Sequence, residues 1–132
     1  MHQGQLFRYE EARRDDRGSG IETVRLGHAP IAGKEFLAGI TSFPPDTSIR
    51  LHTHSTVEQV IILEGEGLAV VNGKELPVRP YDTTVIPAGE PHRFINSGDR
   101  RMSILWIYGG SSVHRTFVDT GETFDQFPPE EG

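Results

Sequence analysis

Four residues in the middle of the chain have side chains that could form a metal site. His52 and His54 are separated by one residue, Glu58 follows four residues later, and His92 lies further along the chain. Side chains at i and i+2 of a β-strand point to the same face, so the two neighbouring imidazoles could share one ion. Neutral imidazoles with a carboxylate suit Mn, Fe, Ni, Cu or Zn better than Mg or Ca.

A His-x-His pair carries little information by itself, because the chain has six histidines and short motifs arise by chance. Taken alone, His92 would be interpreted as a surface or hydrogen-bonded histidine. The prediction of a metal site therefore depends on a fold that brings all four side chains together. A thiolate site is excluded because the chain has no cysteine.

The sequence around these residues is typical of an all-β protein. Glycines and prolines interrupt it at short intervals, and the apolar blocks are short and rich in Val, Ile and Phe, which predicts a sandwich or barrel. Asn72-Gly73 favours a type I′ hairpin turn, and Pro87 begins a second turn. The expected strands are Ile21–Leu26, Phe36–Phe43, Ser48–Thr53, Gln59–Glu64, Leu68–Val71, Lys74–Val78, Thr83–Ile86, His92–Asn96, Met102–Tyr108 and Thr116–Val118.

The spacing of the candidate ligands resembles the two motifs of the cupin family. The first motif reads Gly-x5-His-x-His-x3/4-Glu-x6-Gly, and its matching positions here are His52, His54, Glu58 and Gly65. The second reads Gly-x5-Pro-x-Gly-x2-His-x3-Asn, and its matching positions here are Pro87, Gly89, His92 and Asn96. The sequence departs from the motifs at their first glycines, which are replaced by Asp46 and Tyr81. Both departures concern turns before strands and leave the ligands unchanged.

The resemblance implies a single-domain cupin β-barrel, also described as a double-stranded β-helix or jelly roll. It implies one divalent transition metal (Fe, Mn, Ni, Cu or Zn) inside the barrel, held by His52, His54, Glu58 and His92. The barrel interior could hold a small ligand. Two coordination positions would remain open for water, dioxygen or a bidentate substrate, as Lewis-acid or oxygen-activating chemistry requires.

Arg50 is a candidate catalytic residue, because it lies two residues before His52 and should face the metal. It could hold an anionic substrate, or it could be a rim arginine paired with a surface acid. Glu58 is the second candidate, as a ligand that also acts as general base, a role that needs a raised pKa. The same parity predicts an apolar pocket. Its expected residues are Val60, Ile62, Phe94 and Asn96.

The composition excludes several other classes of function. A net charge of −6 and a pI near 5.4 argue against a nucleic-acid partner, which needs a basic face. No apolar run is long enough to span a membrane, and no secretory signal is visible. We therefore expect a soluble, cytoplasmic protein with neither a nucleic-acid nor a membrane partner.

The expected domain organisation is one barrel with two polar ends. Residues 1–20 form a partly flexible, solvated N-terminal segment, 21–120 the barrel, and 121–132 an acidic tail. The blocks 60–63 and 104–107 are apolar on both faces, so the other sheet, the N-terminal segment or a second subunit must cover the outer face. We favour a homodimer.

The sequence predicts a metal-dependent enzyme acting on a small organic substrate, possibly anionic. Oxygenation by a dioxygenase is the first expectation. The alternatives are a non-redox decarboxylase, isomerase or lyase, in which the metal polarises a carbonyl, and a barrel that binds a small ligand without catalysis. Fold resemblance does not choose between these reactions.

Overall fold

The computed structural model describes residues 4–27, 35–110 and 112–125. Apart from one 3-10 turn, η1 (Tyr9–Glu11), the regular elements of these residues are strands, and no helix among them is long and apolar enough to cross a membrane. The strands are β1 (Arg14–Asp16), β2 (Glu22–Leu26), β3 (Leu37–Phe43), β4 (Thr47–Ser48), β5 (His52–His54), β6 (Glu58–Glu64), β7 (Gly67–Val71), β8 (Lys74–Val78), β9 (Thr83–Ile86), β10 (His92–Asn96), β11 (Met102–Tyr108), β12 (His114–Phe117) and β13 (Thr123–Asp125).

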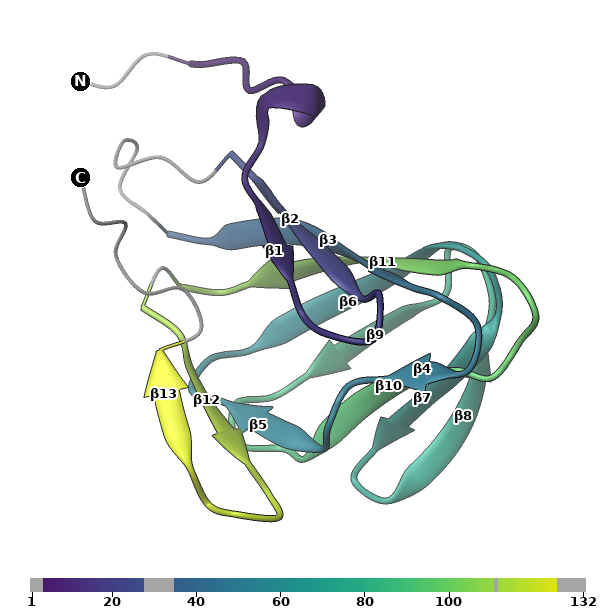
Figure 1. Cartoon of the computed structure of the whole chain (residues 1–132). Coiled ribbons are helices and arrows are strands. Elements are labelled where there is room, and N and C mark those ends of the chain that lie inside the picture. The colour runs from purple at the N-terminus through teal and green to yellow at the C-terminus, as the bar shows by residue number, and fades with distance from the viewer. Residues whose placement is uncertain (1–3, 28–34, 111, 126–132) are drawn as a thin grey trace.

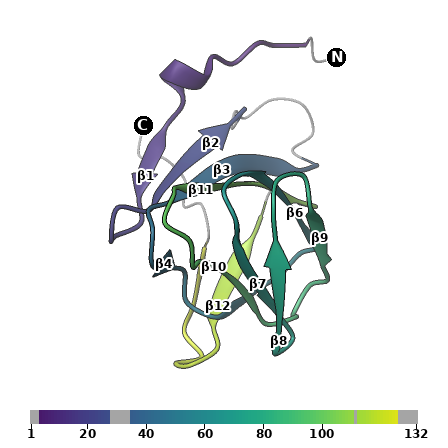
Figure 2. The same cartoon turned by 90° about the vertical axis from the view of Figure 1, so that its right-hand side faces the viewer.

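The strands form two antiparallel sheets that face each other, as Figures 1 and 2 show. The first sheet has the order β1-β2-β3-β11-β6-β9, and the second has the order β13-β12-β5-β10-β7-β8, with β4 paired to β10. Consecutive strands β5 and β6 lie in different sheets, as do β9 and β10. This topology brings residues from both sheets to one interior, and it confirms the all-β barrel expected from the sequence.

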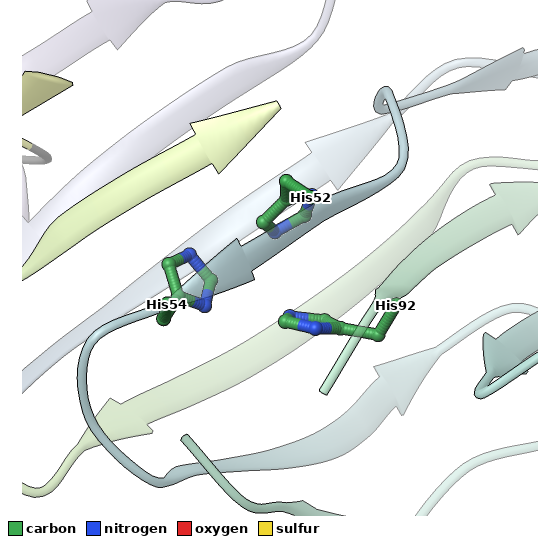
Figure 3. A group of neighbouring side chains, drawn as sticks. All are labelled: His52, His54 and His92. Carbon is green, nitrogen blue, oxygen red and sulfur yellow. The ribbon is translucent and has the colours of Figure 1, made fainter. Parts of the chain in front are cut away.

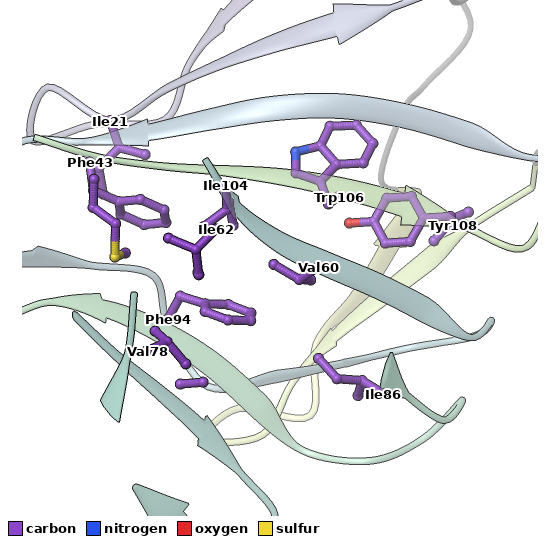
Figure 4. Packing of buried hydrophobic residues seen from close by; sticks show 13 residues of the cluster. Ile21, Phe43, Val60, Ile62, Val78, Ile86, Phe94, Ile104, Trp106 and Tyr108 are labelled. Carbon is purple, nitrogen blue, oxygen red and sulfur yellow. The ribbon is translucent and has the colours of Figure 1, made fainter. Parts of the chain in front are cut away.

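One end of the interior is filled by an apolar core. Phe43, Ile62, Phe94 and Met102 are among its fully buried side chains, and Figure 4 shows Phe43, Ile62 and Phe94 packed between the sheets. Alternation along each strand produces this packing, since every second residue of β6 and β10 points inward. The core leaves the neighbouring part of the interior for the polar side chains described below.

Most of the predicted strands are confirmed, four of them with the same bounds: Lys74–Val78, Thr83–Ile86, His92–Asn96 and Met102–Tyr108. The segment Ser48–Thr53 does not form one strand. The chain leaves the ladder between β4 and β5, because β4 pairs with the far end of β10 while His52 pairs with His92 at its start.

The interpretation of residues 8–20 as a solvated segment and loop is wrong in part. This segment contains β1, which pairs with β2 and extends the first sheet. The acidic tail likewise begins with β13, an exposed strand paired to β12. Both pairings add edge strands that carry few apolar residues, so hydrophobic alternation could not reveal them. The rest of the tail, residues 126–132, lies outside the described residues.

The two departures from the motif glycines occur where the backbone is left-handed. Asp46 has φ = 59° and Tyr81 has φ = 73°, a region that glycine enters freely and other residues enter at a cost of roughly 1 kcal/mol or more. The turns thus keep a conformation suited to glycine although the residues differ. The β7–β8 turn follows the prediction, with Asn72 (φ = 50°) and Gly73 (φ = 80°) both left-handed.

Candidate metal centre

Three histidines from two neighbouring strands converge in the interior. His52 and His54 lie on β5 and His92 on β10, all are buried, and one ring nitrogen of each lies within 4.8 Å of those of the other two. Figure 3 shows the three rings facing one another. The pairing of His52 with His92 sets this arrangement, because directly paired residues project from the same face of the sheet.

Backbone carbonyls fix the orientation of two rings. The Nδ1–H of His52 donates to the carbonyl oxygen of Arg50 at 2.6 Å, and that of His92 donates to the carbonyl oxygen of Glu90 at 2.9 Å. A carbonyl oxygen only accepts, so each Nδ1 carries the proton, and in the neutral ring Nε2 keeps its lone pair. This arrangement is typical of histidines that bind a metal.

Glu58 approaches the histidines from β6, in the opposite sheet. Its Oε1 lies 2.9 Å from Nε2 of His92 and 3.4 Å from Nδ1 of His54. That His54 nitrogen is buried and has no hydrogen-bond partner among the described residues, while its Nε2 is hydrogen-bonded to the Tyr108 hydroxyl at 3.2 Å. A carboxylate and lone-pair nitrogens gathered in a buried space suit a divalent cation. The side chains therefore fit the metal site expected from the sequence.

The protonation states favour the same conclusion. Burial lowers the pKa of His52 to about 2, and the nearby positive charge of Arg115 adds to the effect. Burial opposes the ionisation of Glu58, but the adjacent imidazoles of His54 and His92 outweigh this effect and lower the pKa to about 2. The raised pKa that we expected of Glu58 as a general base is wrong, because the histidines stabilise its charge. Glu58 is instead suited to remain a carboxylate ligand.

Beside the histidines lies a cavity of about 20 Å³, room for one or two water-sized molecules. Its wall is more polar than the sequence predicted. The lining residues are Arg17, Thr41, Ile49, His52, Glu58, His92, Phe94, Ile104, Trp106, Tyr108 and Arg115.

Arg115, on β12, is the most deeply buried charge in this wall apart from the metal-site residues. Its side chain is 7% exposed, and its Nε has no hydrogen-bond partner among the described residues. Burial lowers its pKa to about 10, although the Tyr108 hydroxyl and the Glu58 carboxylate favour the charged form. Arg115 is paired directly with His54 across β5 and β12, so the fold places a cation beside the histidines.

The prediction that Arg50 faces the metal is wrong. Strand β5 begins only at His52, so the alternation of side chains does not extend back to Arg50. Its guanidinium is half exposed, bonds Asp119 at 2.7 Å and stacks on the ring of Phe117 at 3.6 Å. This is the alternative of a rim arginine paired with a surface acid, and the cavity cations are other residues.

Of the four expected pocket residues, Phe94 lines the cavity and also belongs to the core. Val60 and Ile62 are buried in the core but do not line the cavity. Asn96 is fully buried, and its amide donates to the carbonyl oxygens of Phe43, Pro44 and Arg100. Asn96 lies at the far end of β10, where these hydrogen bonds connect neighbouring loops.

Four polar residues of the wall were not among the predicted site residues: Arg17, Thr41, Tyr108 and Arg115. Tyr108 shares strand parity with Trp106 and could have been found from the alternation along β11. Arg115 was missed because the predicted strand began at Thr116, two residues after the observed start at His114. Arg17 follows the short strand β1, inside a run of charged residues where no periodic signal distinguishes it.

Comparison with known proteins agrees with this site. The family model for the cupin domain matches residues 39–108, which is more than half of the chain. The protein belongs to the cupin family. The matched segment includes all four candidate ligands of this cupin, whereas Arg17 and Arg115 lie outside it.

Individual relatives differ in what their names report. An oxalate-binding protein of Thermotoga maritima is 36% identical over 65 residues, covering 48% of this chain and 54% of the relative. The chain spans about half the length of the curated relatives it matches most strongly. A sugar phosphate isomerase from a cupin superfamily of Silicibacter pomeroyi has a TM-score of 0.76 at 22% identity, covering 92% of this chain and 87% of the other. A predicted oxalate decarboxylase of Thermotoga maritima has a TM-score of 0.67 at 25% identity, covering 80% and 99%.

Proposed function

We propose that this cupin is a metal-dependent enzyme whose substrate is a small carboxylate bound between the metal centre and Arg115. The observation that carries the proposal is the buried guanidinium of Arg115 in the wall of the cavity that His52, Glu58 and His92 also line. In the described part of the chain no carboxylate forms an ion pair with it. A buried cation without an anionic partner is costly, and a carboxylate ligand would complete it with two parallel hydrogen bonds.

The residues have separate roles in this proposal. His52, His54, His92 and Glu58 would hold the metal, which when bound supplies a Lewis acid that polarises a substrate oxygen. Arg115 binds and orients the carboxylate. The Tyr108 hydroxyl keeps its proton because burial holds its pKa well above the usual value, so it is a neutral hydrogen-bonding group beside the substrate.

The proposed reaction class is non-redox: decarboxylation, isomerisation or elimination. We place it ahead of the oxygenation expected from the sequence, because a fixed arginine beside the metal orients a carboxylate for such chemistry. The names of an oxalate-binding protein and an oxalate decarboxylase among the relatives support a small carboxylate as substrate.

The test is turnover of small carboxylates by the metal-loaded protein, measured with and without dioxygen. Oxalate, glyoxylate, malonate and pyruvate would be offered to protein loaded separately with Mn, Fe, Ni, Cu and Zn. We expect turnover of at least one of them that depends on the metal and is unchanged under anaerobic conditions. Turnover coupled to consumption of dioxygen would establish oxygenation instead. Binding without turnover for every metal would contradict the enzymatic proposal and leave a binding barrel.

A homodimer remains part of the proposal. The outward-facing side chains of Ile61, Leu63 and Leu105 are only half-buried, and Val85 is 65% exposed. A second subunit would cover this apolar face of the first sheet. Sedimentation at micromolar concentration should give twice the mass of one chain, and a monomer would overturn this part. The cytoplasmic location also remains a prediction.

A further inference from the structure

We propose that Arg17 is a specificity-determining residue that selects a substrate with a second anionic group, namely a small dicarboxylate. The inference rests on the proposed function, since it concerns the same cavity. Its basis is independent of Arg115: a second guanidinium enters the cavity from outside the matched cupin segment, carried by the hairpin between β1 and β2.

The hairpin holds Arg17 in a defined place. Its amide N–H donates to the carbonyl oxygen of Ile21 at 2.8 Å, and the Ile21 N–H donates back to the carbonyl oxygen of Gly18 at 2.9 Å. Gly18 (φ = 86°) and Gly20 (φ = 80°) adopt left-handed conformations, which close this short turn. The backbone of Arg17 is therefore fixed by the turn rather than free to follow its side chain.

The side chain is connected to the cavity wall by a chain of hydrogen bonds. Nη1 of Arg17 donates to the Thr23 hydroxyl at 3.2 Å, which is hydrogen-bonded to the Thr41 hydroxyl at 2.9 Å. Thr41 in turn accepts from Nε1 of Trp106 at 2.9 Å. Thr41 and Trp106 both line the cavity. The guanidinium has further N–H groups that this single contact does not use.

The charges in the wall do not balance. Arg17 and Arg115 face one carboxylate, Glu58, which lies against the histidines. Asp15 is an acid whose charge acts on Arg17, but its oxygens accept from Arg25 at 2.8 Å and from Arg13 at 3.3 Å. With a divalent metal the cavity has a large excess of positive charge. A dianion would offset it better than a monocarboxylate.

The small volume of the cavity favours a compact dianion. A volume of about 20 Å³ leaves little room for a sugar that carries a phosphate. A compact dicarboxylate could place one carboxylate at the metal and Arg115 and present the other to Arg17. Inorganic phosphate has comparable charge, so the experiment includes it as a separate arm.

Isothermal titration of the metal-loaded protein tests the proposal with oxalate, glyoxylate and inorganic phosphate as probes. Oxalate and glyoxylate differ by one ionised oxygen, so their affinity ratio measures recognition of the second carboxylate. In Arg17→Gln we expect oxalate binding to weaken by about tenfold or more, the range of a lost charged hydrogen bond, and glyoxylate binding to change by less than about threefold. Metal content is measured after each titration, because oxalate binds metals.

The controls separate specificity from folding and from the proposed function. Arg14→Gln removes the same charge from an exposed residue of β1 and should leave both affinities unchanged. Arg17→Lys keeps the charge without the planar fork, so part of the oxalate preference should return. The proposal for Arg17 would be overturned if Arg17→Gln weakened the binding of oxalate and glyoxylate equally or weakened neither. It would also be overturned if the substitution affected only the binding of phosphate. If none of the probes binds to the wild-type protein, the proposed function itself fails.

Discussion

The histidine side and the arginine side of the cavity are built from different parts of the chain. The histidines and Glu58 come from β5, β6 and β10, inside the segment that the cupin model matches. Arg17 comes from the hairpin after the edge strand β1, and Arg115 comes from β12, which lies between β5 and the edge strand β13. Both arginines lie outside that segment. The four candidate metal ligands thus lie within the segment that matches the family model, while the two arginines of the cavity wall lie outside it.

Under the proposed function, substitutions of the candidate ligands would remove the metal, whereas substitutions of Arg17 and Arg115 would change the charge beside it without disturbing the core. The two sides should therefore be separable by mutation. Substitution of the histidines should abolish metal binding, and substitution of the arginines should weaken anion binding while the metal remains.

The largest effect is expected for the double variant His52→Ala, His54→Ala. It removes two imidazoles that the structure holds within ligand distance of one site. Loss of a supporting residue alone costs ten- to 100-fold in metal affinity, so we expect at least about 100-fold weaker binding, measured by metal analysis after equilibrium dialysis. His114→Ala, an exposed histidine paired with Asp125, is the control. Equal metal content in the double variant and the wild type would refute the assignment.

The sequence predicted the histidine side more completely than the arginine side for a physical reason. The side chains of β10 alternate strongly between buried and half-buried, so this strand was placed with its correct bounds, and the His-x-His spacing is meaningful on any strand. The edge strand β1 has no apolar period, because all three of its residues are charged. The side chain of Arg50 was misplaced because the strand is interrupted between β4 and β5. At such an interruption the direction of a side chain depends on tertiary contacts, which the local sequence does not show.

A smaller effect is expected for Arg115→Gln, which should retain the metal and lose affinity for oxalate. The lost contacts are charged hydrogen bonds, so the expected weakening is about ten- to 100-fold. Separate titrations with the metal and with oxalate measure the two affinities. Arg50→Gln is the matched control, because this guanidinium is half exposed and paired with Asp119. If Arg50→Gln weakened oxalate binding more than Arg115→Gln, the arginine side would be wrongly assigned.

The smallest effect is a pH dependence of stability in the metal-free protein. The pKa of His52 is lowered by burial from 6.5 to about 2 in the folded state, so below pH 6.5 the unfolded chain binds a proton that the folded chain excludes. Stability is therefore full above pH 6.5 and falls as the pH decreases toward 4.5, with an upper limit of about 1.4 kcal/mol per pH unit for this group. Urea denaturation between these values measures the slope.

The matched comparison for the pH experiment is His52→Gln. This variant has no imidazole at the site, so its unfolding free energy should vary less over the same range. The window ends at pH 4.5 because Glu58, whose pKa is also lowered to about 2, contributes its own loss of stability below that value. A slope that is the same in the variant and the wild type would show that burial does not hold His52 neutral.

The central claim is that one ligand contacts both sides of the cavity, and nuclear relaxation of 13C-labelled oxalate by protein loaded with Mn²⁺ tests it most directly. Paramagnetic relaxation requires the carboxylate to lie beside the metal. The dependence of this relaxation on Arg115 shows whether the arginine binds the same oxalate molecule. We expect strong relaxation with the wild type and with Arg50→Gln, and little with Arg115→Gln at equal Mn²⁺ occupancy, after subtraction of the protein-free filtrate. Equal relaxation with Arg115→Gln, or none with fully loaded wild type, would contradict the account.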